Sequence, residues 1–319
     1  MSPSPRPRSW PTPDPMIELH DVTKRYGPTV AVDHLSLEVR SGEVTGFLGP
    51  NGAGKSTTMR MIVGLDAPTS GRVTVDGQPY RDLRFPLRHV GALLDAKAIH
   101  PGRSARDHLR WLADSNGISR RRVDDVLEIV GLADVAHRRS GGFSLGMGQR
   151  LGIASALLGD PGTLLLDEPV NGLDPEGIQW IRQLLRSLAD EGRSILVSSH
   201  LMSEMAQTAD RLIVVGRGRL ITEGTVAEVV HGSVTGHVRV DTAEPHRLSA
   251  LLAERGGHAT TQPDGTLAVT GIDARDVGIV AGGAGITLYE LTSRSASLED
   301  AFFELTRDAT EYTTRGAAA

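Results

Sequence analysis

The sequence predicts an α/β protein whose core is a parallel sheet, with an antiparallel β region before it and a small α+β domain after it. In the middle of the chain, short apolar runs alternate with amphipathic helical runs, an order typical of parallel sheets. Strand-like alternation precedes this region, and near Val230 the pattern changes to a shorter mixture of strands and helices. A chain of 319 residues is long enough for one large and one small domain.

The N-terminal part of the chain contains two patterns. Residues 1–15 are rich in proline and lack the apolar stretch of a secretory signal, so we expect a disordered segment there. From Met16, the runs MIELHDV and HLSLEV alternate apolar and polar residues around a KRYGPT turn, which predicts antiparallel strands. The run GRVTVDG at residues 71–77 predicts a hairpin.

The central region supplies the elements of the parallel sheet. The apolar strand EVTGFLG leads directly into the helical run KSTTMRMIVGL, and residues 104–139 are rich in helix formers. TLLLDEP predicts a second buried strand, and the next run predicts an amphipathic helix with Pro175 in its first turn and Gly192 at its end. SILVSSH and RLIVVGRGRLITEG predict further strands. We therefore expect one domain over residues 16–230.

The C-terminal part has its own order of elements. HVRVD, HRLSALLAERG, a hairpin around PDG at 263–265, DARDVGIV and ITLYELT predict strand, helix, two strands, helix and strand. A β-α-β-β-α-β order is typical of a compact domain of this size. We expect a separate α+β domain over residues 231–308 that ends in a helix capped by Ser297, and a disordered tail over residues 309–319.

Composition restricts the classes of function. The chain has 34 basic and 39 acidic residues, a net charge of −5, which argues against binding to nucleic acid. The arginine run at 120–122 is flanked by aspartates, which favours a solvated helix face. There is no cysteine for a disulfide or a thiolate metal site, and no apolar run approaches the roughly 20 residues of a membrane span.

The run GPNGAGKST has the spacing G-x-x-x-x-G-K-[ST] of a phosphate-binding loop, or P-loop. In such a loop the backbone wraps the phosphates, the lysine reaches their oxygens and the serine hydroxyl binds Mg²⁺. The lysine is one of only three in the chain. ATP and Mg²⁺ are therefore the predicted ligands. The predicted nucleotide-binding residues are Gly49, Pro50, Asn51, Gly52, Ala53, Gly54, Lys55, Ser56 and Thr57.

Two acids end the predicted strand TLLLDEP. After a P-loop, an acid at the end of a buried strand is expected near Mg²⁺, so Asp167 joins Ser56 as a predicted metal-site residue. Glu168 follows directly and is well placed to polarise an attacking water, which makes it the predicted catalytic base.

A second loop of small residues, FSLGM at 143–147, opens an apolar helical run. With the P-loop, this loop, the acidic strand end, NGLDP and SILVSSH in that order, the sequence resembles the nucleotide-binding subunit of an ABC (ATP-binding cassette) transporter. The resemblance implies that FSLGM is the signature loop, which contacts the ATP of a second subunit. Ser144 and Gly146 match the family's pattern, whereas Leu145 replaces its first glycine and Met147 its final glutamine.

The resemblance implies roles for four further residues. Tyr26 matches an aromatic residue that stacks on adenine, the alternative being a tyrosine packed in an edge strand. Asp174 lies in the loop after the catalytic acid, at a helix N-cap, and His200 matches a catalytic histidine that contacts the γ-phosphate. Asp95 stands where the family usually has a glutamine that touches Mg²⁺ and the attacking water. The alternative for Asp95 is a solvated loop acid.

The resemblance also implies partners. A head-to-tail dimer with a second copy would bury two ATP molecules. A helical subdomain over residues from about 96 to 160 would dock on a separate membrane permease. This places the protein in the cytoplasm, on the inner face of the membrane. The C-terminal domain and its ASLEDAFFELT ending resemble exporters of drugs and antibiotics, which implies efflux of a hydrophobic compound.

Two other functions are weighed against transport. A soluble ABC ATPase acting on ribosomes or DNA usually carries two cassettes in one chain or a long coiled-coil insertion, and neither is present in this sequence. A P-loop kinase would leave FSLGM and His200 unexplained.

Overall fold

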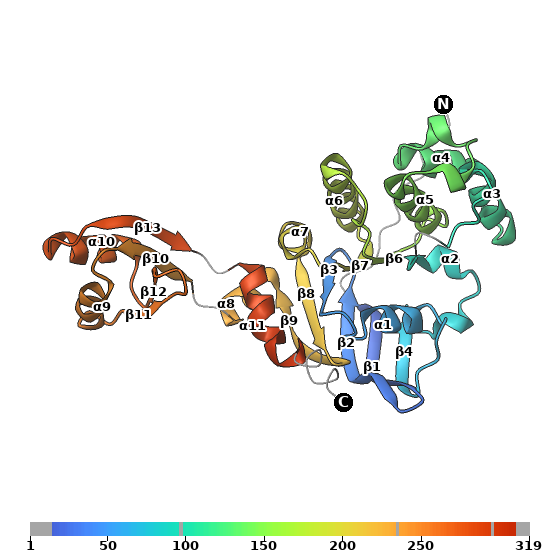
Figure 1. Ribbon diagram of the computed structural model, residues 1–319. Helices are drawn as coiled ribbons and strands as arrows, with labels where there is room; N and C mark the ends of the chain where they lie inside the picture. The colour runs from blue at the N-terminus through green and yellow to red at the C-terminus, as the bar shows by residue number, and fades with distance from the viewer. Residues whose placement is uncertain (1–14, 96–97, 234–235, 295–296, 311–319) are drawn as a thin grey trace, which may run out of the picture. The chain divides into compact units, whose positions relative to one another are not determined.

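The computed structural model describes residues 15–95, 98–233, 236–294 and 297–310 (Figure 1). The predicted disordered segments 1–15 and 309–319 lie outside these ranges, except that Pro15 begins strand β1 (Pro15–Tyr26) and residues 309 and 310 end helix α11 (Leu298–Thr310). The chain divides into two compact units. One contains the residues up to Val226 and those from Thr306 onward, and the other is Ala227–Leu305.

The first unit is built on a six-stranded sheet. Its strands, in spatial order, are β5 (Val90–Leu93), β6 (Thr163–Asp167), β7 (Ser194–Ser198), β3 (Val44–Leu48), β8 (Arg211–Gly216) and β9 (Arg219–Thr225). The first five are parallel, and β9 pairs with β8 in antiparallel orientation. Every residue of β3 and β7 is buried, as expected for apolar runs in a parallel sheet. Because parallel strands end at one edge, the segments that follow β3, β6 and β7 start at the same edge of the sheet.

Helix α6 (Pro175–Asp190) connects β6 to β7 and α7 (Met202–Thr208) connects β7 to β8, while α1 (Lys55–Ile62) follows β3 and α2 (Pro86–His89) precedes β5. The predicted amphipathic helix is α6, which buries Ile181, Leu185 and Leu188. The predicted N-cap is confirmed, since the Asp174 carboxylate accepts the N–H of Gly177 at 2.8 Å. Within the described residues, no helix has both the length and the apolar character needed to cross a bilayer.

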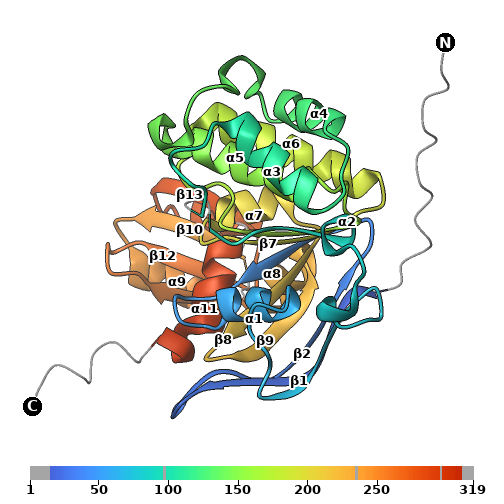
Figure 2. The same ribbon diagram turned by 90° about the vertical axis from the view of Figure 1, so that its right-hand side faces the viewer.

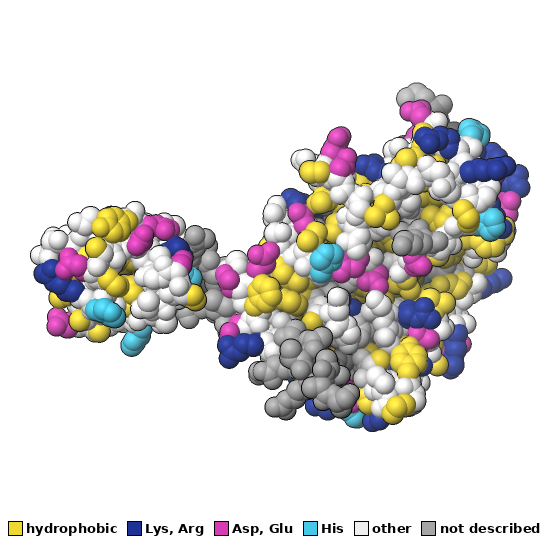
Figure 3. Space-filling model, in the orientation of Figure 1, with side chains coloured by type: hydrophobic (Ala, Val, Ile, Leu, Met, Phe, Trp, Pro, Cys, Tyr) yellow, Lys and Arg dark blue, Asp and Glu magenta, His cyan; other side chains and the backbone are white. Residues whose placement is uncertain are grey.

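Three helices, α3 (Ala105–Ser115), α4 (Arg121–Ile129) and α5 (Leu145–Leu157), lie together at one end of this unit (Figure 2). Basic and acidic side chains are mixed over the outer surface of α3 and α4 (Figure 3). Arg120 pairs with Asp114 at 2.8 Å, and Arg122 lies 3.3 Å from Asp160. The arginine run is therefore part of a solvated, charge-paired helix face, as the flanking aspartates predict.

A separate three-stranded antiparallel sheet has the order β2 (Thr29–Arg40), β1, β4 (Ser70–Val75). The predicted pairing of the first two strands is confirmed. The hairpin predicted at 71–77 is wrong, because β4 pairs with β1 and not with a strand that follows it. A turn does form, with Val75 paired to Gln78 across it. Pro79 then follows without an N–H group to continue a ladder.

The second unit has a four-stranded antiparallel sheet with the order β11, β12, β10, β13. The elements in chain order are β10 (His237–Thr242), α9 (Pro245–Ala253), β11 (His258–Thr261), β12 (Leu267–Thr270), α10 (Ala274–Gly283) and β13 (Leu288–Arg294). The predicted β-α-β-β-α-β order is confirmed. Helix α8 (Val226–Ser233) precedes it, and Ser297 caps α11 by accepting the N–H of Asp300 at 3.1 Å.

Candidate active site

A cleft of about 730 Å³ in the first unit brings together most of the predicted site residues. Its lining comes from segments far apart in the sequence, including the ends of β1 and β6, the loop after β3 and the loop after β5. The predicted site residues that line it are Tyr26, residues 51–57, Asp95, Leu145, Asp167 and Glu168.

The P-loop connects β3 to α1, and glycine geometry shapes it. Gly54, the residue before α1, has φ 97°, and no side chain caps the helix. A Cβ at Gly54 would lie 2.5 Å from the carbonyl oxygen of Ala31, so only glycine fits. The first N–H groups of α1 thus have no side-chain acceptor and lie in the wall of the cleft, where an anion can accept their hydrogen bonds.

Lys55 lies within this loop. Its Nζ donates to the carbonyl oxygens of Gly49 at 2.6 Å and Pro50 at 3.3 Å. Burial lowers the pKa of Lys55, while the carboxylates of Glu168 and Asp167 act in the opposite direction. The amine is thus partly removed from water and faces anions, which strengthens its attraction for a phosphate.

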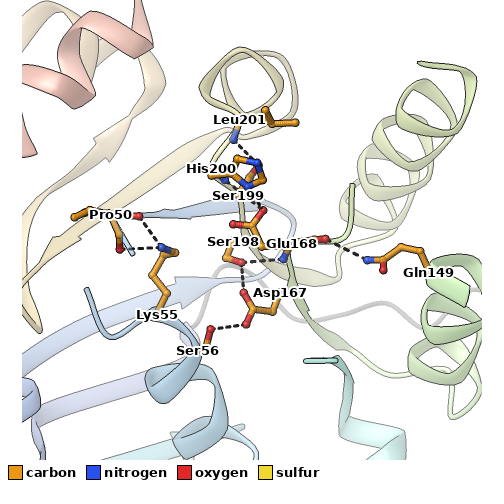
Figure 4. A network of polar contacts seen from close by, with 11 residues as sticks. Pro50, Lys55, Ser56, Gln149, Asp167, Glu168, Ser198, Ser199, His200 and Leu201 are labelled. Atoms are coloured by element: carbon orange, nitrogen blue, oxygen red, sulfur yellow. Dashed lines mark hydrogen bonds and ion pairs between the residues drawn. The ribbon is translucent and has the colours of Figure 1, made fainter. Parts of the chain in front are cut away.

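The carboxylate of Asp167 is held on both oxygens. Ser56 Oγ donates to Oδ2 at 2.7 Å, and Ser198 Oγ donates to Oδ1 (Figure 4). Mg²⁺ prefers oxygen ligands such as hydroxyl and carboxylate groups, so Ser56 and Asp167 fit this metal. Asp95 lines the same cleft. Within the described residues, no group of three or more His, Cys, Asp or Glu could hold a metal.

Glu168 and His200 form a pair beside this metal-site acid. His200 Nδ1 lies 2.7 Å from Glu168 Oε2, and the backbone N–H of His200 donates to the same oxygen at 3.3 Å (Figure 4). Glu168 lines the cleft, whereas the His200 side chain is 59% exposed. A carboxylate oriented in this way can accept a proton from a water molecule in the cleft.

Tyr26 ends β1 with its side chain in the wall of the cleft. Its hydroxyl donates to Asp66 Oδ2 at 2.9 Å, and Lys24 Nζ lies 4.9 Å from the ring centroid. β1 is the central strand of its sheet, but at Tyr26 it pairs only with β2, through Thr29, because its pairing with β4 ends at Thr23. Tyr26 is 46% exposed, so its ring is accessible for stacking.

Most residues of the signature loop lie outside the P-loop cleft of the same chain. Ser144 is the N-cap of α5 and accepts the N–H of Met147 at 3.2 Å. Leu145 is 56% exposed and lines both the main cleft and an adjoining cavity of about 230 Å³, which Ser144 also lines. Neither Ser144 nor Gly146 nor Met147 lines the cleft that contains the P-loop of the same chain.

The sequence analysis missed two residues that hold Glu168. Ser198 Oγ accepts the Glu168 N–H at 2.9 Å, and the buried Gln149 donates from Nε2 to the Glu168 carbonyl oxygen at 3.2 Å. A weak signal exists for Ser198, a serine in an otherwise apolar strand, but not for Gln149, whose neighbours Gly148 and Arg150 are only half-buried. That signal does not reveal the partner.

The sequence profile of the ABC transporter family matches residues 32–171, and a domain of unknown function matches residues 236–299. The bacitracin transport ATP-binding protein BcrA of Bacillus licheniformis is 44% identical over 65% of this chain and 69% of its own length. The Nod factor export ATP-binding protein I of Rhizobium meliloti is 36% identical over 92% and 89%. A solved dimeric ATP-binding cassette in a post-hydrolysis state, bound to ADP and Pi, is 28% identical, with a TM-score of 0.61 over 66% of this chain and 98% of that one.

Proposed function

The chain belongs to the ABC transporter family, and on this premise we propose that hydrolysis of ATP in the P-loop cleft drives export through a separate membrane subunit. The ATP-binding subunits of this family bind and hydrolyse ATP, so the chain is an ATPase. One observation supports the catalytic and metal-binding roles that we propose below. The Glu168–His200 pair lies next to the Asp167–Ser56 pair, at the ends of neighbouring strands.

Each side chain has a distinct role in this proposal. Lys55 and the N–H groups of α1 bind the phosphates of ATP. Ser56 and Asp167 hold Mg²⁺, which neutralises phosphate charge when it is bound. Glu168 accepts the proton of the attacking water, and His200 keeps the Glu168 carboxylate oriented through its contact at 2.7 Å.

We propose that two copies pair head to tail, so that Ser144 and Gly146 of one copy close over the ATP bound by the other. Two observations support this arrangement. The solved relative is dimeric, and Ser144 does not line the P-loop cleft of its own chain. The dimer then attaches to a permease on the inner face of the membrane, as the transport names of the relatives suggest.

The proposed cargo is a hydrophobic compound of the drug or antibiotic class. One named relative serves bacitracin transport and the other Nod factor export, so the names of both relatives favour transport over a role on ribosomes or DNA. Cargo contacts belong to the membrane subunit in this proposal.

Glu168→Gln tests the proposed catalytic step. The amide cannot accept the proton, so phosphate release at saturating MgATP should fall by about 10²- to 10⁴-fold while ATP affinity is retained. Glu254→Gln, at the exposed end of α9 in the second unit, is the matched control and should keep wild-type turnover. Wild-type turnover in Glu168→Gln would remove Glu168 as the base.

A further inference from the structure

Ser198, the last residue of β7, is a fully buried serine whose hydroxyl contacts both acids of the site. We propose that Ser198 is a positioning residue for hydrolysis, which fixes the metal-site acid Asp167 and the base Glu168 relative to one another. The proposal rests on the proposed function and goes beyond it, since neither ATP nor water needs to touch Ser198.

The position of Ser198 follows from strand register. In the parallel pairing of β6 with β7, Ser198 is the register partner of Asp167. Its Oγ donates to Asp167 Oδ1 and accepts the N–H of Glu168 at 2.9 Å (Figure 4). A hydroxyl carries a single proton, an ionised carboxylate can only accept, and a backbone N–H can only donate. Both partners therefore fix the orientation of the Ser198 hydroxyl, and its proton points to Asp167.

The Glu168 backbone needs such support. Its φ of 51° lies in the left-handed region, which residues with a side chain rarely adopt unless their surroundings impose it. The surroundings are Ser198 on the amide, Gln149 on the carbonyl oxygen and His200 on the carboxylate. Without the Ser198 hydroxyl, the amide keeps only the longer bond to the Ser198 carbonyl oxygen, at 3.2 Å. The direction of the Glu168 side chain is then less well determined.

Asp167 depends on the same hydroxyl from the other side. Its Oδ2 is held by Ser56 of α1, and its Oδ1 by Ser198 of β7. The carboxylate is thus oriented between the P-loop helix and the strand that leads to His200. Removal of the Ser198 hydroxyl leaves Oδ1 without this donor and frees the carboxylate to rotate away from the metal-binding direction.

Ser198→Ala and a matched control on the same strand test the proposal. Ser194 begins β7, is also 0% exposed, and donates from Oγ to the Arg40 carbonyl oxygen at 2.9 Å, away from both acids. We expect Ser198→Ala to lower turnover at saturating MgATP by about 10- to 100-fold, the usual effect of losing an orienting partner of a metal site. Ser194→Ala should keep wild-type turnover.

A second measurement separates positioning from general weakening of the fold. In titration calorimetry, Ser198→Ala should weaken ATP binding in the presence of Mg²⁺ but not in EDTA, whereas Ser194→Ala should change neither. Ser198→Cys nearly preserves the buried volume but offers only a weak hydrogen-bonding group. It should therefore lose turnover as predicted for Ser198→Ala, and it takes the place of that variant if the alanine protein fails to fold. Ser198→Thr keeps the hydroxyl and should recover most of the turnover.

Two outcomes would overturn the proposal. One is wild-type turnover in Ser198→Ala or Ser198→Cys, and the other is an equal loss of turnover in Ser194→Ala and Ser198→Ala. An inactive wild-type protein would instead contradict the proposed function.

Discussion

Two loops of small residues each open an α-helix in this chain, and the two helices begin differently. Helix α1 follows Gly54, which is left-handed and offers no side chain to cap the helix. Helix α5 follows Ser144, whose hydroxyl accepts the N–H of Met147 at 3.2 Å. The P-loop therefore presents free helical N–H groups to a ligand, whereas in the signature loop one of these groups is already satisfied by the protein itself.

The two loops also differ in how tightly they are packed. The P-loop requires glycine at position 54, where a Cβ would meet a backbone oxygen at 2.5 Å. In the signature loop Leu145 is exposed, and a Cβ at Gly146 would lie 3.0 Å from the carbonyl oxygen of Gly172, whereas one at Gly148, just after the loop, would meet nothing within 4 Å. Steric constraint thus requires glycine at position 54 of the P-loop, while the exposed position of Leu145 leaves room for the departure there.

The largest effect predicted for these two loops tests whether they serve different ATP molecules. Lys55→Ala removes the cation that faces the phosphates, and Ser144→Arg puts a long side chain in the signature loop. Each variant alone should lose turnover by about a hundredfold. Mixed in equal amounts, the two should recover up to about a quarter of wild-type turnover, because half of the dimers are mixed and each of those keeps one intact site.

Phosphate release from the mixture, measured against each variant alone, provides the test. If both loops act on the ATP of the same chain, every chain in the mixture is defective and no activity returns. Absence of recovery in a mixture that forms mixed dimers would thus contradict the head-to-tail arrangement.

A smaller effect separates the packing at Gly54 of the P-loop from that at Gly148 in α5, just after the signature loop. Gly54→Ala must adopt φ near 97° against the Ala31 carbonyl oxygen, which should lower the free energy of unfolding by about 1–2 kcal/mol or more and weaken ATP binding. Gly148→Ala lies inside α5 with open space around it, so it should raise the free energy of unfolding by up to about 1 kcal/mol. Urea denaturation without nucleotide measures both, and similar losses in the two variants would refute the contrast.

The smallest expected effect concerns Asp95, which lines the P-loop cleft from the loop after β5. A carboxylate that reaches the metal through a water contributes about 1 kcal/mol, so Asp95→Ala should raise the Mg²⁺ concentration for half-maximal turnover by about fivefold. Asp95→Gln tests whether the side chain usual in the family serves as well. An unchanged Mg²⁺ requirement in both variants would leave Asp95 as a cleft-lining residue without a role in the reaction.

Most of the fold could be predicted from the sequence because its signals are local. Apolar strands that alternate with helices predicted the parallel sheet, and Asp174 and Ser297 predicted two helix starts through their capping chemistry. The hairpin at 71–77 was wrong because the alternation of β4 shows a strand but not its partner. That partner is β1, more than forty positions earlier in the chain.

The sequence by itself determined the P-loop and the Asp167–Glu168 pair, since covalent spacing holds the residues of each motif together. Only the tertiary structure decided how these motifs meet. Strand β7 lies between β3, which leads into the P-loop, and β6, which carries Asp167. The order and register of these strands place Ser198 opposite Asp167 and bring His200 to Glu168. Such contacts depend on which strands are neighbours, and strand order follows from the packing of the whole sheet rather than from any short segment.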